Sequence, residues 1–299
     1  MPPEPCETIT RELLERWPLP TAPGGSKEQR GRVVVVAGMR TIPGAALLAA
    51  NAALRAGAGK LQVAAPASAA IAIAVDLPEA LVMPFEERED GAPALRSVDE
   101  IAQYVRSAQA LVLGPGMAPN DACSAFVKAL VTAVTTPLVL DASALFACKQ
   151  CESLLAHLDG NAVLTPHADE LSALIDIDAE EIAADPARYA RDTSRRFNAV
   201  VTLKGAKTFI AAPDGTLYVN EFGHDGLATS GSGDVLAGVL GGLLARGATA
   251  LQAAVWGVSL HALAGAALGD RIGIGFLARE LLAEIPMQMR SLSSEQPSR

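Results

Sequence analysis

Aromatic residues make up only 4% of this 299-residue sequence and charged residues 19%, whereas apolar residues account for 50%. Basic residues are especially few, because 24 Lys and Arg face 33 Asp and Glu and leave a net charge of −9. Binding to nucleic acid or to an anionic membrane requires clustered Lys and Arg. The composition therefore argues against both kinds of partner and favours a small-molecule ligand, in a chain long enough to bury one large core.

Cysteine is also scarce, with four residues, Cys6, Cys123, Cys148 and Cys151. They are too few and too irregularly spaced for a disulfide scaffold, which favours a reducing compartment and hence the cytoplasm. Cys148 and Cys151 form the pair "CKQC", but no second pair with zinc spacing follows. We interpret them as incidental thiols.

A signal peptide and a membrane span are two further features that we do not expect. The N-terminal segment "MPPEPCETITRELLERWPLP" has acidic residues where a signal peptide needs basic ones, and no apolar core follows. The long apolar stretch after Leu251 is interrupted by His261 and by many Gly and Ala. We therefore expect such stretches to form buried helices.

Short apolar runs that end in Gly, Pro or a polar residue are the main structural signal. Such runs are typical of parallel strands buried on both faces of a sheet. The runs are residues 31–38, 61–66, 110–116, 136–143, 161–167 and 199–205. Segments with helical spacing of apolar residues lie between them, as in 44–58, 124–134 and 169–175. This alternation predicts an α/β fold with a doubly wound, mostly parallel central sheet.

The pattern changes after Lys204. Residues 207–220, "KTFIAAPDGTLYVN", predict two alternating strands joined by a hairpin turn. The apolar helix of residues 226–247 is expected next, followed by two long helices that end at about Met289. We therefore expect an N-terminal extension over residues 1–29, a single catalytic domain over 30–289 and a flexible polar tail over 290–299.

Ligands of such sheets bind outside the carboxyl ends of the strands. The residues that close the apolar runs should therefore meet at one rim of the sheet. They are Gly38, Met39, Gly114, Pro115, Gly116, Asp141, His167 and Lys204.

The stretch "GLATSGSGDVLAGVLGGLLARG", residues 226–247, places glycines and hydroxyl residues at the mouth of an apolar helix. Gly231 and Gly233 allow a ligand to approach the backbone, and the free amides of a helix start favour an anion. Asp234 stands where it could take a proton from a hydroxyl that attacks a phosphoryl group. The alternative is that Ser232 and Asp234 only cap a helix whose glycines permit close packing.

Several motifs in order resemble the ribokinase-like superfamily and, within it, the ADP- or ATP-dependent NAD(P)H-hydrate dehydratases. The motifs are "VVVVAGMRTIPGAALLAANAALRAGAGKLQVAAP", "LPEALV", "LVLGPGM", "LTPHADEL", "KGAKT" and "GLATSGSGDVLAG". The resemblance runs from about Arg30 to Pro286. It implies a ribokinase-like three-layer α/β/α fold and a nucleotide-dependent dehydration of hydrated NADH or NADPH. In that reaction the ring hydroxyl is phosphorylated and phosphate then leaves.

The resemblance also implies a set of site residues. Asp234 is the implied catalytic base and touches the substrate. The implied substrate positions are Ala45, Gly116 and His167, and the implied ADP or ATP positions are Lys204, Gly205, Ala206, Lys207, Thr208, Gly231, Ser232 and Gly233. Glu170 would hold Mg²⁺ through water. The alternatives are that His167 is an outward-facing helix cap and that Glu170 is an ordinary first-turn acid. We interpret His261 as a core histidine bonded to a carbonyl.

This chain departs from the family pattern at several positions, which are Ser143, Asp169, His224, Asp225, Ser230 and Ala266. The fold and the phosphoryl chemistry tolerate these changes, but the changes leave the identity of the substrate open. Two other functions therefore stay open. One is a small-molecule kinase for a hydroxymethyl or sugar substrate, and the other is a non-catalytic nucleotide-binding regulator.

Partners follow from the same resemblance. The epimerase domain that is often fused to this family is not expected here, because about thirty residues precede the first predicted strand. A separate epimerase chain would then act on the same metabolite. We also expect a homo-oligomer, and we expect the second substrate to enter from the side of Gly38, Ala45, Gly116 and His167.

Overall fold

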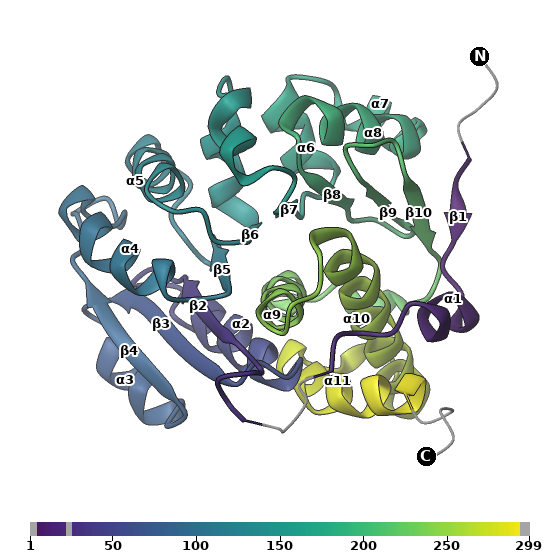
Figure 1. The fold of residues 1–299 in the computed structure, drawn as a ribbon, viewed down its shortest axis with the longest axis horizontal. Helices are drawn as coiled ribbons and strands as arrows, with labels where there is room; N and C mark the ends of the chain where they lie inside the picture. The colour runs from purple at the N-terminus through teal and green to yellow at the C-terminus, as the bar shows by residue number, and fades with distance from the viewer. Residues whose placement is uncertain (1–4, 22–25, 294–299) are drawn as a thin grey trace.

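The computed structural model describes residues 5–21 and 26–293, and these residues form one ten-stranded sheet between two layers of helices (Figure 1). The strand order is β1-β10-β9-β8-β7-β6-β5-β2-β3-β4. The strands are β1 (Glu7–Thr8), β2 (Arg32–Val36), β3 (Lys60–Pro66), β4 (Ala80–Phe85), β5 (Ala110–Leu113), β6 (Leu138–Leu140), β7 (Ala162–Leu164), β8 (Val200–Leu203), β9 (Thr208–Ala211) and β10 (Leu217–Asn220).

The six predicted parallel strands are confirmed as β2, β3, β5, β6, β7 and β8. The predicted hairpin is confirmed as the antiparallel pair β9 and β10. From β2 the chain builds the sheet toward β4 on one side, and from β5 it builds toward β8 on the other. The strand order therefore reverses between β2 and β5, the kind of position where open α/β sheets bind ligands.

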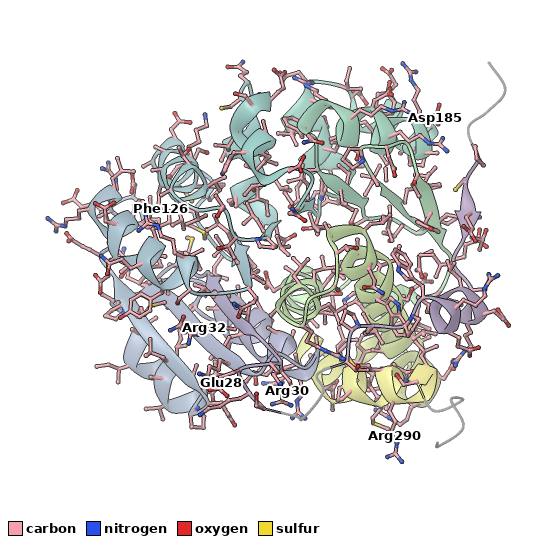
Figure 2. All side chains as sticks on the ribbon, viewed as in Figure 1. Glu28, Arg30, Arg32, Phe126, Asp185 and Arg290 are labelled. Carbon is pink, nitrogen blue, oxygen red and sulfur yellow. The ribbon has the colours of Figure 1, made fainter. Side chains whose placement is uncertain are left out.

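Helices cover both faces of the sheet, and each layer has its own apolar core. One layer holds α1 (Arg11–Arg16), α2 (Gly44–Arg55), α3 (Ala70–Asp76), α9 (Ser232–Ala245), α10 (Ala250–Ile272) and α11 (Ala278–Ser293). The other holds α4 (Val98–Arg106), α5 (Asp121–Thr132), α6 (Ala168–Ile175), α7 (Ala179–Ala184) and α8 (Pro186–Phe197). Phe126 of α5 is buried in the second layer, whereas Arg290 extends outward from α11 (Figure 2). The predicted three-layer arrangement is confirmed.

Short 3₁₀ helices occur in the loops: η1 (Leu95–Ser97), η2 (Ala142–Cys148), η3 (Glu152–Leu158), η4 (Asp225–Leu227) and η5 (Gly273–Gly275). The two long helices predicted after the apolar helix α9 are confirmed as α10 and α11, and Gly273, whose φ of 74° ends α10, separates them. Helix α11 continues to Ser293 rather than ending at about Met289. The rest of the predicted flexible tail, 294–299, lies outside the described residues.

The described part of the N-terminal extension lies against the catalytic domain. Strand β1 adds to the sheet edge beside β10. The indole Nε1 of Trp256 donates to the carbonyl of Trp17 at 2.8 Å, and Arg246 donates to the carbonyl of Pro20 at 3.1 Å. The division of the chain at residue 30 stays a prediction.

Helix α10 is long and apolar enough to cross a membrane by composition, yet 78% of its apolar window is buried inside the protein. It is therefore a core helix, as the sequence predicted. Its neighbour α9 is almost wholly buried too, and it packs closely on α2. A Cβ added at Gly238 would lie 2.1 Å from the carbonyl oxygen of Ala49, and one at Gly242 would lie 2.4 Å from that of Ala53. The glycines within α9 thus allow two helix backbones to touch.

Candidate active site

The start of α9 forms the floor of the site. Gly231 is the N-cap residue with a φ of 89°, and the described residues provide no side-chain cap for this helix. The amides of Gly233 and Asp234 likewise have no acceptor within the described part of the chain. Unpaired amides at a helix start favour an anion. This geometry supports the anion cradle over the alternative in which Ser232 and Asp234 only cap the helix.

Lys204 follows β8 and faces this helix start. A Cβ added at Gly233 would lie 3.7 Å from its Nζ and, apart from the neighbouring residues and backbone of its own helix, would meet no other described atom within 4 Å. Open space beside a backbone and a lysine suits the oxygens of a phosphate.

Two acids hold the lysine in place. Its Nζ lies 3.2 Å from Asp141, which follows β6, and 3.5 Å from Glu170 of α6. Asp141 is buried and accepts a hydrogen bond of 2.6 Å from the hydroxyl of Thr165. Burial alone would lower the pKa of Lys204, but the charges of Asp141 and Glu170 outweigh it and raise that pKa. Lys204 therefore remains a cation at neutral pH.

The pKa of the Asp234 carboxyl bears directly on catalysis. Burial and, after it, the charge of Asp141 raise the pKa of its carboxyl to about 7, although the charge of Lys204 partly opposes the rise. A carboxyl that titrates near neutral pH is suited to general base catalysis. The structure thus places the residue chosen from the sequence where it can take up a proton.

The predicted substrate positions Ala45 and Gly116 lie against each other at the reversal of strand order. A Cβ added at Gly116 would lie 2.5 Å from the Cβ of Ala45 and 3.4 Å from the Cα of Gly38. The amide of Gly38 donates to the carbonyl of Pro115 at 2.7 Å. These small residues leave a smooth backbone wall at the sheet rim, so the convergence predicted from the strand ends is confirmed.

His167 begins α6 and forms a capping box with Glu170. Its Nδ1 accepts from the amide of Glu170 at 3.3 Å, and its own amide donates to the Glu170 carboxylate at 2.8 Å. His167 is therefore a helix cap, which was the alternative interpretation, although it also pairs with Lys204 at the rim. Its contact with substrate stays a prediction.

Glu170 places one carboxylate near Lys204. The described residues hold no group of three His, Cys, Asp or Glu that could bind a metal on its own. A single acid still fits Mg²⁺, which is commonly held by one or two carboxylates together with water and substrate phosphates. The role of Glu170 stays a prediction on these grounds.

A cavity of about 400 Å³ lies beside Lys204 on the other side of the site. Most of its lining is apolar, which suits a flat aromatic ring. The lining residues are Ala168, Ile182, Ala183, Pro186, Leu203, Lys204, Gly205, Ala206, Lys207 and Phe209. The side chain of Lys207 forms an ion pair with Glu221 at 2.5 Å and is 60% exposed. Four of the five residues predicted in "KGAKT" therefore line one cavity, whereas Thr208 lies at the start of β9.

Sequence reasoning missed parts of this site. It placed Asp141 on the rim but gave it no role, and it did not include Thr165 or the wall from α7 and α8. The end of an apolar run signalled Asp141, yet its pairing with Lys204 joins residues that are 63 positions apart. No local pattern reveals such a contact.

His261 is a core histidine, as interpreted from the sequence. Its Nε2 lies 3.0 Å from the carbonyl oxygen of Ser232 and 3.0 Å from the hydroxyl of that residue. Burial lowers the pKa of His261 to about 4, so the ring is neutral and can donate to the carbonyl. His261 therefore supports the start of α9 from behind.

Two of the departures from the family pattern have structural roles. The hydroxyl of Ser143 donates to the carbonyl of Met117 at 2.9 Å, so it holds the loop that contains Gly116. The Nδ1 of His224 accepts from the amide of Gly226 at 3.0 Å, and its ring packs against Gly269. Both residues thus support loops beside the site.

Comparisons with known proteins agree with this geometry. A family model described as NAD(P)H-hydrate dehydratase matches residues 33–287. The ADP-dependent (S)-NAD(P)H-hydrate dehydratase of Xanthomonas campestris pv. campestris is 48% identical over 280 residues, which are 93% of this chain and 94% of that protein.

Solved structures are similar to this chain in both sequence and fold. The ADP/ATP-dependent NAD(P)H-hydrate dehydratase from Bacillus subtilis, co-crystallised with ATP and Mg²⁺, is 29% identical. It superposes with a TM-score of 0.84, covering 96% of this chain and 99% of that one. Ribokinase from Thermotoga maritima, 15% identical with a TM-score of 0.54 over 85% of this chain and 99% of that one, shares the fold alone. The predicted ribokinase-like fold is confirmed.

Proposed function

The chain belongs to the NAD(P)H-hydrate dehydratase family, and from that premise we propose that it is a lyase that dehydrates hydrated NADH and NADPH with ADP or ATP. The observation that carries the proposal is the position of Asp234. Its carboxyl has a pKa of about 7 and lies at the start of α9, close enough to Lys204 and Asp141 for their charges to shift that pKa. The reaction is metabolite repair, because it restores a damaged cofactor.

The residues divide the chemistry among them. Asp234 takes the proton of the ring hydroxyl as that oxygen attacks the terminal phosphoryl group. Lys204 and the amides at the start of α9 hold the phosphoryl oxygens while the nucleotide leaves. The ring nitrogen then expels phosphate by breaking the carbon–oxygen bond, and loss of a proton from the neighbouring carbon restores the ring double bond. Magnesium, held near Glu170 through water, would neutralise part of the phosphate charge.

Two ligands reach Asp234 from opposite sides. We place the nucleotide with its base in the cavity of about 400 Å³ and its phosphates toward Lys204. The hydrated ring lies on the side of Ala45 and Gly116. This arrangement supports an in-line transfer between the two.

The direct test is incubation with chemically hydrated NADH and either ADP or ATP. We expect the absorbance of reduced nicotinamide to return, with release of inorganic phosphate. A stable phosphorylated product from a hydroxymethyl or sugar substrate, without that return, would identify a small-molecule kinase. Nucleotide binding without turnover of any of these substrates would identify a regulator.

Replacing Gly233 with Val should weaken nucleotide binding. The side chain would enter the open space in front of Lys204, where the phosphoryl oxygens must approach the backbone. Lost charge-assisted hydrogen bonds of about 1.5–3 kcal/mol each predict a roughly tenfold or larger rise in the Kd for ADP. Isothermal calorimetry measures the change, and Gly275→Val, at a position where an added Cβ meets no described atom within 4 Å, is the matched control. An unchanged Kd would place the nucleotide elsewhere.

The charge of Asp141 should affect the pH dependence of kcat/KM. In the wild type, the acid limb of kcat/KM should lie near the Asp234 pKa of about 7, because protonated Asp234 cannot act as a base. Asp141→Asn removes one cause that raises this pKa, so the limb should move to lower pH. The control Asp169→Asn removes an acid whose side chain is 84% exposed and should leave the limb in place. A limb that stays near 7 in Asp141→Asn would contradict the contribution of Asp141 to the pKa of Asp234.

Oligomeric state and location complete the proposal. Ile71 and Val75 of α3 are 81% and 78% exposed, beside the edge strand β4, which supports a homo-oligomer formed through apolar contacts. Light scattering measures the mass in solution, and a monomer mass would contradict the proposed homo-oligomer.

The four cysteines are free thiols, which supports a cytoplasmic location.

A separate epimerase is also part of the proposal. The Xanthomonas relative is named for the (S) form of the hydrate. If this chain accepts the same form, the other epimer has to be converted by a second enzyme before it can be repaired.

A further inference from the structure

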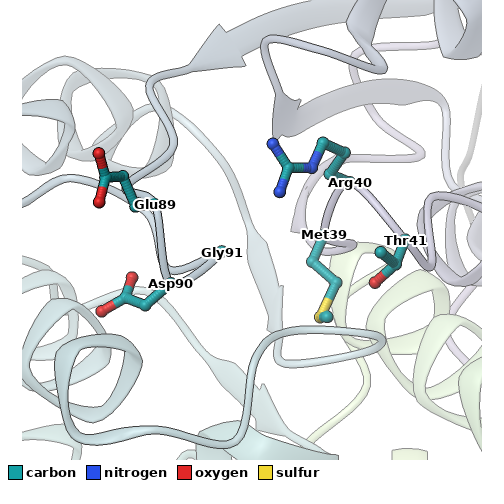
Figure 3. Close-up of a pocket in the computed structure, with 6 residues that line it drawn as sticks. All are labelled: Met39, Arg40, Thr41, Glu89, Asp90 and Gly91. Carbon is teal, nitrogen blue, oxygen red and sulfur yellow. The ribbon is translucent and has the colours of Figure 1, made fainter.

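A second pocket lies at the sheet rim, between the loop that follows β2 and the loop that follows β4 (Figure 3). Its volume is about 140 Å³, well below the roughly 300–1,000 Å³ of sites that enclose a whole drug-sized ligand. It is lined by Met39, Arg40, Thr41, Glu89, Asp90 and Gly91. It therefore suits one group of a longer ligand.

Arg40 supplies an unused cation to this pocket. Within residues 5–21 and 26–293 its side chain makes neither an ion pair nor a hydrogen bond, although two acids line the same pocket. Asp90 instead pairs with Arg88 at 3.3 Å and accepts from the amide of Ala92 at 3.1 Å. Figure 3 shows the guanidinium of Arg40 directed across the gap toward residues 89–91. A free guanidinium beside a gap is suited to a phosphate, which it can bind through two hydrogen bonds.

The pocket is continuous with the proposed substrate side. Gly116 lies against Ala45 and Gly38, and Met39 and Arg40 follow Gly38 directly. On the opposite wall, an added Cβ at Gly91 would lie 4.0 Å from Ala118, two residues beyond Gly116. A ligand that leaves the Ala45 wall in this direction therefore enters the gap in front of Arg40.

Contacts within the fold connect Asp234 with the pocket. A Cβ at Gly231, beside Asp234, would lie 2.5 Å from Leu48 of α2. Leu48 is three residues, or about one helical turn, beyond Ala45. A chain of packing contacts therefore runs from the start of α9 through the first turn of α2 and Gly116 to the loop that holds Arg40. A dinucleotide whose hydrated ring lies at Asp234 and whose chain follows this direction would bring its pyrophosphate toward Arg40.

We propose that Arg40 binds the pyrophosphate of the hydrated dinucleotide and so determines affinity for this substrate. The inference rests on the proposed function, because it takes the hydrated ring to lie at Asp234. The pyrophosphate is shared by the NADH and NADPH forms, so Arg40 should serve both equally. The nucleotide cosubstrate lies on the Lys204 side and makes no use of it.

The test is steady-state kinetics of Arg40→Ala with hydrated NADH, hydrated NADPH and ADP. We expect KM for both hydrated dinucleotides to rise roughly tenfold or more, with kcat and the KM for ADP nearly unchanged. Arg40→Lys should restore part of the affinity, and Arg11→Ala on α1 is the control for loss of one positive charge. An unchanged KM for both substrates would overturn the proposal. A rise for hydrated NADPH alone would overturn it as well, because it would assign Arg40 to the 2′-phosphate.

Calorimetry separates this proposal from the proposed function. Intact NADH carries the same pyrophosphate, so its Kd should rise by a similar factor in Arg40→Ala whether or not the wild type turns over a hydrated substrate. If the wild type shows no turnover but the Kd for NADH rises, the proposed reaction is wrong and the role of Arg40 stands. An unchanged Kd for NADH contradicts that role directly.

Discussion

Asp234→Asn is expected to lower kcat with hydrated NADH by about a hundredfold or more. Asn keeps the shape of the side chain and most of its hydrogen bonding, but it cannot accept a proton from the ring hydroxyl. The Kd for ADP should change little, because Lys204 and the amides at the start of α9 are retained. Turnover is measured by the return of nicotinamide absorbance, and Asp270→Asn, at an exposed position on α10, is the matched control. Near-normal turnover in Asp234→Asn would remove this residue from the mechanism.

The same variant should be more stable than the wild type above neutral pH. The folded-state pKa of Asp234 is raised from 3.8 to about 7, so the folded protein must ionise a partly buried acid beside Asp141 as pH rises. That destabilisation is fully present above pH 7 and disappears as pH falls through the unfolded pKa near 4. Thermal unfolding should therefore give Asp234→Asn a higher Tm at pH 8 and an equal Tm at pH 4. An equal Tm at both would show that the carboxyl is not strained by its surroundings.

Gly238→Val is expected to cause the largest loss of stability. The added Cβ would lie 2.1 Å from the carbonyl oxygen of Ala49 and 2.7 Å from the Cβ of Ala52, so α9 and α2 would have to separate. Overpacking of a core usually costs about 1–3 kcal/mol. Here a backbone atom is in the way, so we expect at least the upper value, which for a chain of this length is a fall in Tm of about 5 °C or more.

Thermal unfolding by circular dichroism measures this loss, again with Gly275→Val as the control. Activity should fall as well, because α9 carries both Asp234 and the anion cradle. A Tm within a degree or so of the wild type would mean that the two helices can separate without cost, which contradicts close packing of their backbones.

The sheet shows which parts of this fold could be predicted from the sequence. Its central strands are buried on both faces, so they appear as continuous apolar runs that end in Gly or a polar residue, and all six were predicted. The edge strand β4 was not. Its side chains alternate between exposed and buried, and Pro84 interrupts it, so its apolar signal is weaker.

The site, like the sheet, has features that could be predicted from the sequence and features that could not. Glycines that need a positive φ or an open backbone, such as Gly231 and Gly116, are local features and can be recognised in a motif. Asp234 and Lys204 could be chosen because each lies at the end or the start of a regular element. The position of His167 was also readable, but its capping box with Glu170 was only one of two alternatives.

The sequence by itself therefore determined the fold class, the rim on which the site lies, and the residue types gathered there, because periodicity and strand ends are local properties. Only the tertiary structure decided that Asp141 pairs with Lys204, that the pKa of Asp234 is raised to about 7, and that Arg40 faces a gap with no partner among residues 5–21 and 26–293. Each of these depends on distance and burial among residues far apart in the chain. Coulomb energy and desolvation are set by those quantities, and they arise only when the elements pack together.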